Sequence, residues 1–329
     1  MPHTTDKILE VENLRTYFFT EAGTVKAVDG ISFNLAKGET LGLVGESGSG
    51  KTITAFSVLR IVPRPGRIVD GKITFEGTSL LDLSEAEMRK IRGSKIAIVF
   101  QDPSSSLNPV FTVGDQIADI IMHHQDLKKQ EAHRKTIDLL KMVGISEVAT
   151  RAHQYPHQLS GGMKQRIAVA RALACEPALL FADEPTTNLD VTIQAQVLEL
   201  IKDLKKKLNM SLVMITHDMG IIAEMTDRVT VLYAGCVCES ASTKELFKTP
   251  VHPYTVALLR AVPRIDRIGG LSVIPGSIPN LIEPPSGCRF HPRCGFATEV
   301  CGKEVPQLVE VSPDHFVACN RWEELTLSR

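Results

Sequence analysis

The feature that most limits the fold of this chain is residues 45–52, which read Gly-Glu-Ser-Gly-Ser-Gly-Lys-Thr. They match the pattern of a phosphate-binding loop. The apolar run 41–44 precedes them, and a helix-compatible stretch over 52–61 follows. A strand, a loop and a helix in this order point backbone N–H groups and a helix N-terminus at phosphate oxygens. A plain glycine-rich turn is the alternative, but chance produces such a match in roughly one chain in a hundred of this length.

The loop residues have separate expected roles. Its glycines let the backbone curl into a concave nest that a Cβ atom would crowd. Lys51 can reach the β- and γ-phosphates of a nucleotide, and Thr52 can ligate Mg²⁺. The expected nucleotide contacts are Gly45, Ser47, Gly48, Ser49, Gly50, Lys51 and Thr52.

A pair of acidic residues follows a second apolar run, 179–182. The run is typical of a buried parallel strand, and Asp183 stands at its carboxyl end, where sheets of this kind bind ligands. An aspartate at a strand end usually caps a helix, but here Glu184 follows at once. We expect Asp183 to hold Mg²⁺ through water and Glu184 to act as general base on the attacking water.

Four further segments occur in a fixed order along the chain. They are Val-Phe-Gln-Asp-Pro at 99–103, Leu-Ser-Gly-Gly-Met-Lys-Gln-Arg at 159–166, Thr-Asn-Leu-Asp at 187–190 and Ile-Thr-His-Asp at 215–218. With the motifs above, they make the chain resemble the ATP-binding subunit of an ABC transporter, and in particular the dipeptide/oligopeptide importer ATPases. The resemblance covers nearly the whole chain. It implies an α/β fold: a P-loop NTPase cassette with a mixed or parallel sheet core, an antiparallel β subdomain and an α-helical subdomain.

The resemblance implies a catalytic set of Glu184, Gln101 and His217. Gln101 matches the glutamine that touches Mg²⁺ and the attacking water. His217 matches the histidine that senses the γ-phosphate. A lone histidine is more often structural, but its register with the other motifs favours the functional role.

The resemblance also implies that the site is shared between two subunits. Ser160, Gly161 and Gly162 start a helical stretch that runs to about residue 174, which places N–H groups and a positive dipole end outward. In the family this signature motif binds the γ-phosphate of ATP held by a second ATP-binding subunit, so that two copies meet head-to-tail. Asp190 lies in the loop that crosses the dimer interface, where Asn188 replaces the usual alanine. A simple helix cap is the alternative for Ser160.

An aromatic platform for adenine is expected near the N-terminus. Tyr17, Phe18 and Phe19 are adjacent in a predicted strand, where alternation places Phe18 on the opposite face from the other two. Spacing relative to the family favours Phe18 as the residue that stacks on the base, although all three could be core residues.

Length and composition limit the organisation of the chain. The 329 residues suit two domains, with a net charge of −1 that does not favour a nucleic-acid partner. We expect a nucleotide-binding domain at 1–250, with a helical subdomain at about 103–172, and a proline-rich extension at 251–329. No apolar run approaches the ~20 residues of a membrane span, and the N-terminus does not resemble a signal peptide. The resemblance to a transporter subunit implies a peripheral location on the cytoplasmic face of the cell (inner) membrane, where ATP is.

Four of the seven cysteines lie in the extension: Cys288, Cys294, Cys301 and Cys319. A cytosolic chain rarely keeps disulfides, which favours shared metal ligation. Zinc sites usually use closely paired cysteines, whereas well-separated thiolates suit a 4Fe-4S cluster. The importer tails that the chain resembles carry such clusters. His291 and His315 could substitute as ligands, and zinc or unliganded thiols remain the alternatives.

The resemblance implies an ATP-hydrolysing subunit of an importer for di- and oligopeptides, with ATP and Mg²⁺ as cofactors. Its expected partners are two transmembrane permease subunits, a second ATP-binding subunit (a sister chain or itself) and, through the permease, an extracytoplasmic substrate-binding protein. An importer of nickel or another small solute is the first alternative. A soluble ABC ATPase of translation or DNA repair is another, although the chain lacks the second cassette or long coiled coil typical of those proteins.

Overall fold

The computed structural model describes residues 6–262 and 274–325. The chain forms two compact units. The first combines residues 1–82 with residues 214–329, and the second is residues 83–213. Strand β8 (Ser211–Thr216) contains the boundary between them.

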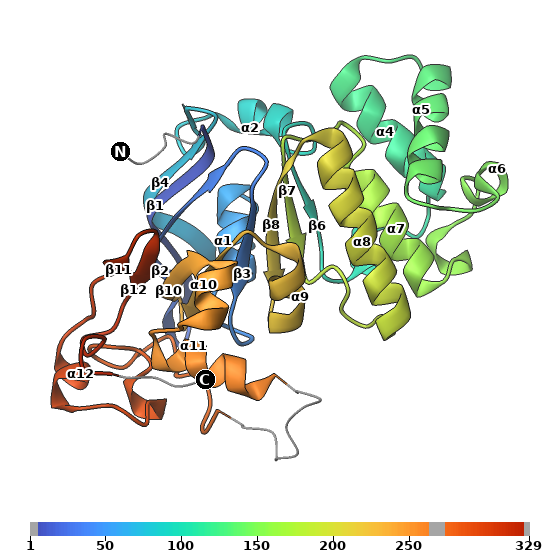
Figure 1. Cartoon of the computed structure of the whole chain (residues 1–329). Coiled ribbons are helices and arrows are strands. Elements are labelled where there is room, and N and C mark those ends of the chain that lie inside the picture. Colours follow the sequence, from blue (N-terminus) through green and yellow to red (C-terminus); the bar gives the residue numbers. More distant parts are fainter. Residues whose placement is uncertain (1–5, 263–273, 326–329) are drawn as a thin grey trace. The chain divides into compact units, whose positions relative to one another are not determined.

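The first unit contains an antiparallel sheet with the strand order β2-β1-β4-β5 (Figure 1). Its strands are β1 (Lys7–Thr20), β2 (Gly23–Ala36), β4 (Gly66–Phe75) and β5 (Thr78–Ser79). The long β1–β2 hairpin closes where Thr20 faces Gly23. This sheet matches the antiparallel β subdomain predicted from the sequence.

A second set of strands in this unit has the order β11-β12-β10-β9-β3. The strands are β3 (Thr40–Val44), β9 (Arg228–Tyr233), β10 (Cys236–Ser242), β11 (Val309–Ser312) and β12 (His315–Val317). β3 and β9 are parallel, whereas the β9–β10, β10–β12 and β11–β12 pairs are antiparallel. All five residues of β3 are buried, as expected for the apolar strand before the loop.

The helices of the first unit are α1 (Lys51–Val58), α9 (Met219–Met225), α10 (Thr243–Lys248), α11 (Pro253–Ala261), η2 (His291–Arg293) and α12 (Glu299–Lys303). α1 is shorter than the predicted helix over 52–61. Arg60 has a left-handed φ of 53°, and Pro63 follows, so the chain cannot continue as a helix.

The second unit is mainly helical, with two parallel strands, β6 (Ile96–Val99) and β7 (Leu179–Asp183) (Figure 1). Its helices are α2 (Glu85–Ile91), α3 (Pro103–Ser106), α4 (Val113–Gln125), α5 (Lys129–Met142), α6 (Val148–Arg151), η1 (Pro156–Gln158), α7 (Gly161–Ala172) and α8 (Val191–Leu208). Side-chain caps start several of them, including Ser84 on α2, Thr112 on α4 and Asp190 on α8.

The C-terminal extension contains more regular structure than its proline content suggested. Its last strand, β12, pairs with β10, with Glu239 facing Val317 and Ser240 facing Phe316. Phe290 packs its ring against those of Tyr233 and Tyr254, with centroid distances of 5.1 Å and 5.2 Å. The pairing of β12 with β10 and the packing of Phe290 on Tyr233 therefore join the extension to the rest of the first unit.

Candidate functional site

The phosphate-binding loop lies in the first unit, between β3 and α1. Gly45, Gly48 and Gly50 have φ values of 156°, 83° and 103°, which side-chain-bearing residues rarely adopt. A Cβ atom at Gly45 would lie 2.1 Å from the carbonyl oxygen of Leu232, and one at Gly50 would lie 2.6 Å from that of Ala27. Only glycine therefore fits at these two positions of the loop.

Lys51 is the first residue of α1, and its side chain turns back over the loop. Its Nζ donates to the carbonyl oxygens of Gly45 at 2.7 Å and Glu46 at 2.9 Å. Ser49 is fully buried, whereas Ser47 is exposed at the loop surface. Gly50 provides no side-chain cap for α1, which suits a helix start that receives an anion.

Glu46 connects this loop to the C-terminal extension, a contact that sequence reasoning missed. Its carboxylate accepts two hydrogen bonds from Arg293, at 2.7 Å and 3.1 Å. Its backbone N–H donates to the hydroxyl of Tyr254 at 2.9 Å. Hydrogen bonding to Glu46 raises the pKa of Arg293, so the guanidinium stays charged. Nothing in the local sequence around Glu46, Tyr254 or Arg293 indicated this contact.

The three candidate adenine platforms are in different environments. The Tyr17 hydroxyl donates to Asp29 at 2.6 Å, which occupies its polar end. Phe18 is half-buried, and a Cβ at Gly66 would lie 2.8 Å from its ring. Phe19 is 46% exposed and lies below the guanidinium of Arg67. These environments do not select one of the three, and Phe18 stays our proposed platform on the family spacing alone.

His217 follows β8 and is exposed. The next residue, Asp218, caps α9 by accepting hydrogen bonds from the N–H groups of Gly220 and Ile221. This cap fixes the backbone directly after His217, so that the imidazole is presented at the start of a helix.

The carboxylate pair lies in the second unit, at the end of β7. Asp183 is 3% exposed, and Glu184 is half-buried. Gln101 donates from Nε2 to Oε2 of Glu184 at 2.9 Å, and Thr187 donates to the same oxygen at 2.9 Å. The structure thus brings two of the predicted catalytic residues, Gln101 and Glu184, into contact. Thr187 is an additional partner that sequence reasoning assigned only to the interface loop.

The signature residues start α7 in the second unit. Ser160 is the N-cap, and its Oγ accepts the N–H of Met163 at 3.3 Å. A Cβ at Gly162 would lie 2.9 Å from the Ile193 side chain, so glycine permits close approach of α7 to α8. Asp190 caps α8 by accepting the N–H of Ile193 at 3.0 Å. Ser160 and Asp190 are both exposed.

The four tail cysteines line one small pocket, with a volume of about 20 Å³. All are free thiols. Burial raises the pKa of Cys288 to about 11 and also raises the pKa values of Cys294 and Cys319. In the described part of the chain, no three Cys, His, Asp or Glu side chains are placed to share a metal ion. His315, a possible substitute ligand, instead hydrogen-bonds Glu239 at 2.8 Å.

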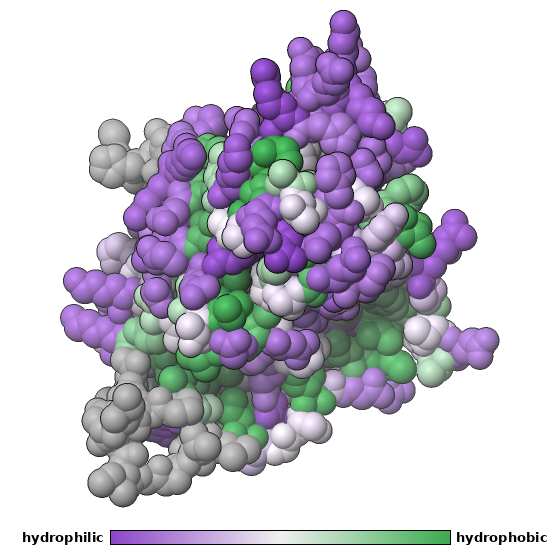
Figure 2. All heavy atoms as spheres, turned by 90° about the vertical axis from the view of Figure 1, so that its right-hand side faces the viewer, coloured by the Kyte–Doolittle hydropathy of each residue, from purple (hydrophilic) through white to green (hydrophobic). Residues whose placement is uncertain are grey.

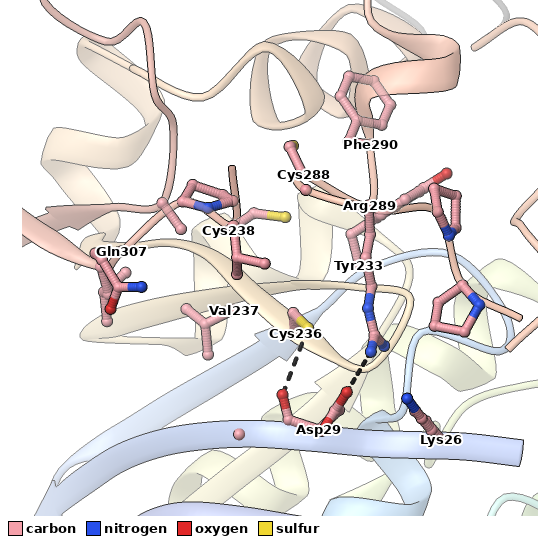
Figure 3. A pocket seen from close by; sticks show the side chains of 18 of the residues that line it. Lys26, Asp29, Tyr233, Cys236, Val237, Cys238, Cys288, Arg289, Phe290 and Gln307 are labelled. Carbon is pink, nitrogen blue, oxygen red and sulfur yellow. Dashed lines mark hydrogen bonds and ion pairs between the residues drawn. The ribbon is translucent and has the colours of Figure 1, made fainter. Parts of the chain in front are cut away.

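A larger pocket of about 600 Å³ lies between the β1–β2 hairpin, the β9–β10 hairpin and the extension (Figure 3). Asp29 lies on one side of it and accepts hydrogen bonds from Arg289 and Arg15. Cys236 also points toward Asp29, and its Sγ lies 3.5 Å from the Asp29 carbonyl oxygen. The Arg289–Asp29 ion pair is a second polar link between the extension and the rest of the first unit.

Large hydrophobic side chains reach the surface of the second unit next to its helical segments. Val110 and Phe111 are 69% and 52% exposed, and Tyr155 is 39% exposed. Their segments are adjacent, because the N–H of Val113 donates to the Gln154 carbonyl at 2.9 Å. The face drawn in Figure 2 is mostly hydrophilic, with hydrophobic side chains in groups between the polar ones. Among the described helices, none has the length and apolar character required to cross a membrane.

Two family models match this chain. The model described as ABC transporter matches residues 28–187, and the model described as oligopeptide/dipeptide transporter, C-terminal region, matches residues 238–301. The oligopeptide transport ATP-binding protein AppD of Bacillus subtilis (strain 168) is 49% identical over 319 residues, which are 96% of this chain and 97% of that protein. The dipeptide transport ATP-binding protein DppD of the same organism is 48% identical over 316 residues, 95% of this chain and 94% of that protein.

Solved structures agree with the predicted fold class. The ATP-binding cassette MJ0796, solved as a dimer bound to ADP and Pi, superposes with a TM-score of 0.65 at 27% identity, covering 71% of this chain and 98% of that one. The protein cbiO1 of Clostridium perfringens, part of the ABC transporter complex cbiONQ, gives a TM-score of 0.62 at 30% identity, covering 74% of this chain and 92% of that one. The predicted cassette fold is confirmed.

Proposed function

Because the chain belongs to the family of ATP-binding subunits of oligopeptide and dipeptide ABC transporters, we propose that it hydrolyses ATP to drive uptake of di- and oligopeptides through a separate permease. The observation that carries this proposal is the match along nearly the whole chain to peptide-transport ATPases. The cassette supplies the ATPase chemistry, and the C-terminal region favours peptides over other solutes. We place the boundary between a nucleotide-binding domain and its extension at about residue 250.

In this proposal the nest of residues 45–50 receives the phosphates of ATP, and Phe18 stacks on adenine. Lys51 contacts the β- and γ-phosphates. Thr52 and Gln101 ligate Mg²⁺, and Asp183 binds it through water; their hydroxyl, amide and carboxylate oxygens are the hard donors that this ion prefers. When bound, Mg²⁺ neutralises charge on the phosphate oxygens.

Glu184 accepts a proton from the attacking water as general base. Gln101, which donates to Glu184 at 2.9 Å, orients that water beside the carboxylate. His217 contacts the γ-phosphate and stabilises the charge that develops on it. These three residues form the proposed catalytic set.

The signature motif acts on the ATP of a second ATP-binding subunit. Ser160, Gly161 and Gly162 are exposed or half-exposed at the N-terminus of α7, where N–H groups and the helix dipole attract an anion. Asp190 lies in the loop that meets the partner. Two copies, or this chain and a sister chain, then bind head-to-tail with ATP between them, and hydrolysis releases them.

Two transmembrane permease subunits are the proposed membrane partners, and an extracytoplasmic binding protein delivers the peptide to them. The exposed Val110, Phe111 and Tyr155 support docking of the second unit on a permease, because exposed apolar side chains from adjoining segments mark interaction surfaces. The protein then lies peripherally on the cytoplasmic face of the inner membrane.

Affinity purification of the tagged chain from membranes solubilised in mild detergent tests the proposed function, with mass spectrometry to identify the partners. We expect two polytopic permeases, a sister ATPase and a peptide-type binding protein. Recovery of permeases together with a nickel-type binding protein would contradict the proposed cargo but still support the transporter function. Recovery of ribosomal or DNA-repair proteins without any permease would refute the transporter function.

We also propose that Cys288, Cys294, Cys301 and Cys319 hold a 4Fe-4S cluster. Their convergence on one pocket supports this set, since it joins positions that are widely spaced in the sequence. In such a cluster each thiolate binds a different iron, so the ligands lie farther apart than the four ligands of a single ion. The four thiolates would fasten the extension around the cluster.

Iron analysis of anaerobically purified protein tests the cluster. We expect about four irons per chain and a broad absorbance near ~400 nm, both lost in the Cys294→Ser variant. Cys175→Ser is the matched control, because Cys175 is half-buried in the second unit and should leave the iron content unchanged. Zinc instead of iron, or no metal at all, would refute the cluster.

A further inference from the structure

Glu46, the residue after the first glycine of the phosphate-binding loop, has a hydrogen-bond partner for each of its polar groups. The Glu46 carboxylate accepts from Nη1 and Nη2 of Arg293, its N–H donates to the Tyr254 hydroxyl, and its carbonyl accepts from Lys51 Nζ. Arg293 and Tyr254 both belong to the extension. The course of the loop at Glu46 therefore depends on residues that lie more than 200 positions away in the sequence, with separations of 208 and 247.

Arg293 is itself fixed in orientation. Its side chain is only 6% exposed. Nε donates to the Pro275 carbonyl at 2.7 Å, and Nη2 also donates to the Ile274 carbonyl at 3.3 Å. Nη1 reaches the Tyr233 hydroxyl at 3.3 Å, and the guanidinium lies 5.7 Å from the centre of the Tyr233 ring. A guanidinium held in this way presents a rigid fork to the Glu46 carboxylate.

The two side chains of the Arg293–Glu46 ion pair differ in their exposure to water. The Glu46 side chain is 30% exposed, so water can hydrate the carboxylate if Arg293 is removed. Breaking the pair therefore does not leave an isolated charge in the core. It removes the anchor of the Glu46 side chain, while the Glu46 N–H still donates to Tyr254 and its carbonyl remains one of the acceptors of Lys51 Nζ. The position of the loop, more than the stability of the fold, depends on this contact.

We propose that Arg293 is a positioning residue for nucleotide binding, acting through Glu46 to preorganise the phosphate-binding loop. The extension thereby sets the affinity of the cassette for ATP. A loop that is ordered before the nucleotide arrives loses less conformational entropy on binding. This inference rests on the proposed binding of ATP at residues 45–52.

The Arg293→Ala variant tests the inference in the full-length chain. We expect the Kd for Mg·ATP, measured by isothermal titration calorimetry, to rise about tenfold, roughly the effect of one charge-assisted hydrogen bond. The KM for ATP should rise in parallel, while kcat changes less than about twofold, because the residue does not touch the reacting atoms. An unchanged Kd would overturn the inference.

Arg289→Ala is the matched control. Arg289 lies in the same extension, is 11% exposed and forms an ion pair with Asp29 on β2 (Figure 3). It is also adjacent in sequence to a tail cysteine, as Arg293 is. Its contacts, Asp29 and the Ala234 carbonyl, are outside residues 45–52. We expect Arg289→Ala to lower Tm by about as much as Arg293→Ala does, but to keep the Kd for Mg·ATP within about twofold of wild type. Equal weakening by both variants would indicate a general effect of the extension and overturn a role specific to Arg293.

Two further variants keep the test decisive if Arg293→Ala folds poorly. Arg293→Lys keeps the charge but loses the two-pronged contact, so its Kd should lie between those of wild type and Arg293→Ala. Glu46→Ala alone should weaken ATP binding, and adding Arg293→Ala to it should cause little further loss, because both changes remove the same contact. Additive losses would refute action through Glu46. Wild-type protein that binds no ATP would refute the proposed function itself.

Discussion

At the scale of single residues, the carboxylate of Glu184 is the proposed catalytic group whose hydrogen-bond partners explain its orientation. Hydrogen bonds from Gln101 and Thr187 both reach its Oε2, which fixes the orientation of the carboxylate. Its φ of 43° is in the left-handed region, where a residue with a side chain costs roughly 1–3 kcal/mol. Glu76, Glu147 and Glu176 share this region, so the two hydrogen bonds, and not the backbone conformation, support Glu184 as the proposed base.

Replacing Glu184 by glutamine tests this role. Glu184→Gln keeps the shape and an oxygen acceptor for Gln101 and Thr187 but removes the basic carboxylate. We expect ATP binding to persist and turnover to fall about 100-fold or more, the usual contribution of a general base. Phosphate release and equilibrium ATP binding measure the two effects. Glu199→Gln, at a position with a 59% exposed side chain on α8, should leave turnover unchanged. Undiminished hydrolysis in Glu184→Gln would disprove the assignment.

The burial of His252 leads us to predict that the stability of the protein depends on pH. Burial lowers its pKa to about 4, although the nearby Glu239 acts in the opposite direction. An unfolded histidine binds a proton near pH ~6.5, so between these values the unfolded chain holds more protons than the folded chain. Stability is therefore complete above pH ~6.5 and falls towards pH ~4, by at most about 3 kcal/mol.

Denaturant unfolding from pH 4 to 7, at about half-unit steps, measures this contribution. His252→Asn is the matched variant, because its side-chain oxygen can accept the Tyr254 N–H that the imidazole accepts at 3.0 Å. We expect the variant to lose less stability than wild type as the pH is lowered. Parallel curves would show that His252 does not titrate in this way.

At the scale of secondary-structure elements, Glu239 joins three of them. It lies on β10 and is fully buried. Its carboxylate accepts the N–H groups of Val251 and His252, at the start of α11, at 2.7 Å and 2.9 Å. It also contacts His315 on β12 at 2.8 Å. One carboxylate thus links a strand of the first unit to both a helix and a strand of the chain that follows residue 250.

Glu239→Ala should therefore destabilise the protein strongly. It leaves two backbone donors and an imidazole without their acceptor in the interior, at a cost of about 3 kcal/mol or more. Chemical denaturation monitored by circular dichroism measures the change. Glu299→Ala serves as the control, since its side chain is 83% exposed and its loss should change the free energy of unfolding by less than about 0.5 kcal/mol. Equal stability of the two variants would contradict this role of Glu239.

The elements differ in how far sequence reasoning could predict them. The phosphate-binding loop was predictable because its glycines satisfy a local requirement, visible as φ values such as the 83° of Gly48. The helix N-terminus at Ser160 was predictable for the same reason. The Arg293–Glu46 contact was not, since it joins residues 247 apart and follows no local pattern. The alternation in β11 was visible in Val309–Ser312, but the surrounding prolines favoured irregular structure.

At the scale of the whole molecule, the proposed site residues are divided between two compact units. The phosphate-binding loop and His217 belong to the first, whereas Gln101, Glu184 and the signature residues belong to the second. In the proposed head-to-tail dimer, the signature of one copy completes the phosphate site of the other. The cycle of the transporter then depends on whether an anion can approach the N-terminus of α7.

A bulky side chain at the N-cap of α7 should block this dimer. Ser160→Arg, introduced in both ATP-binding subunits in the Glu184→Gln background, places a long side chain where the partner's γ-phosphate must bind. We expect the ATP-dependent dimer, measured by size-exclusion chromatography with light scattering, to disappear while each subunit still binds ATP. Ser84→Arg is the control for the loss of a cap, because Ser84 is another exposed N-cap serine that accepts an N–H at 3.3 Å. Since both changes cost about 1 kcal/mol of helix stability, a dimer lost only with Ser160→Arg reports on the interface. If the ATP-dependent dimer persists in Ser160→Arg, the signature motif does not take part in the shared nucleotide site.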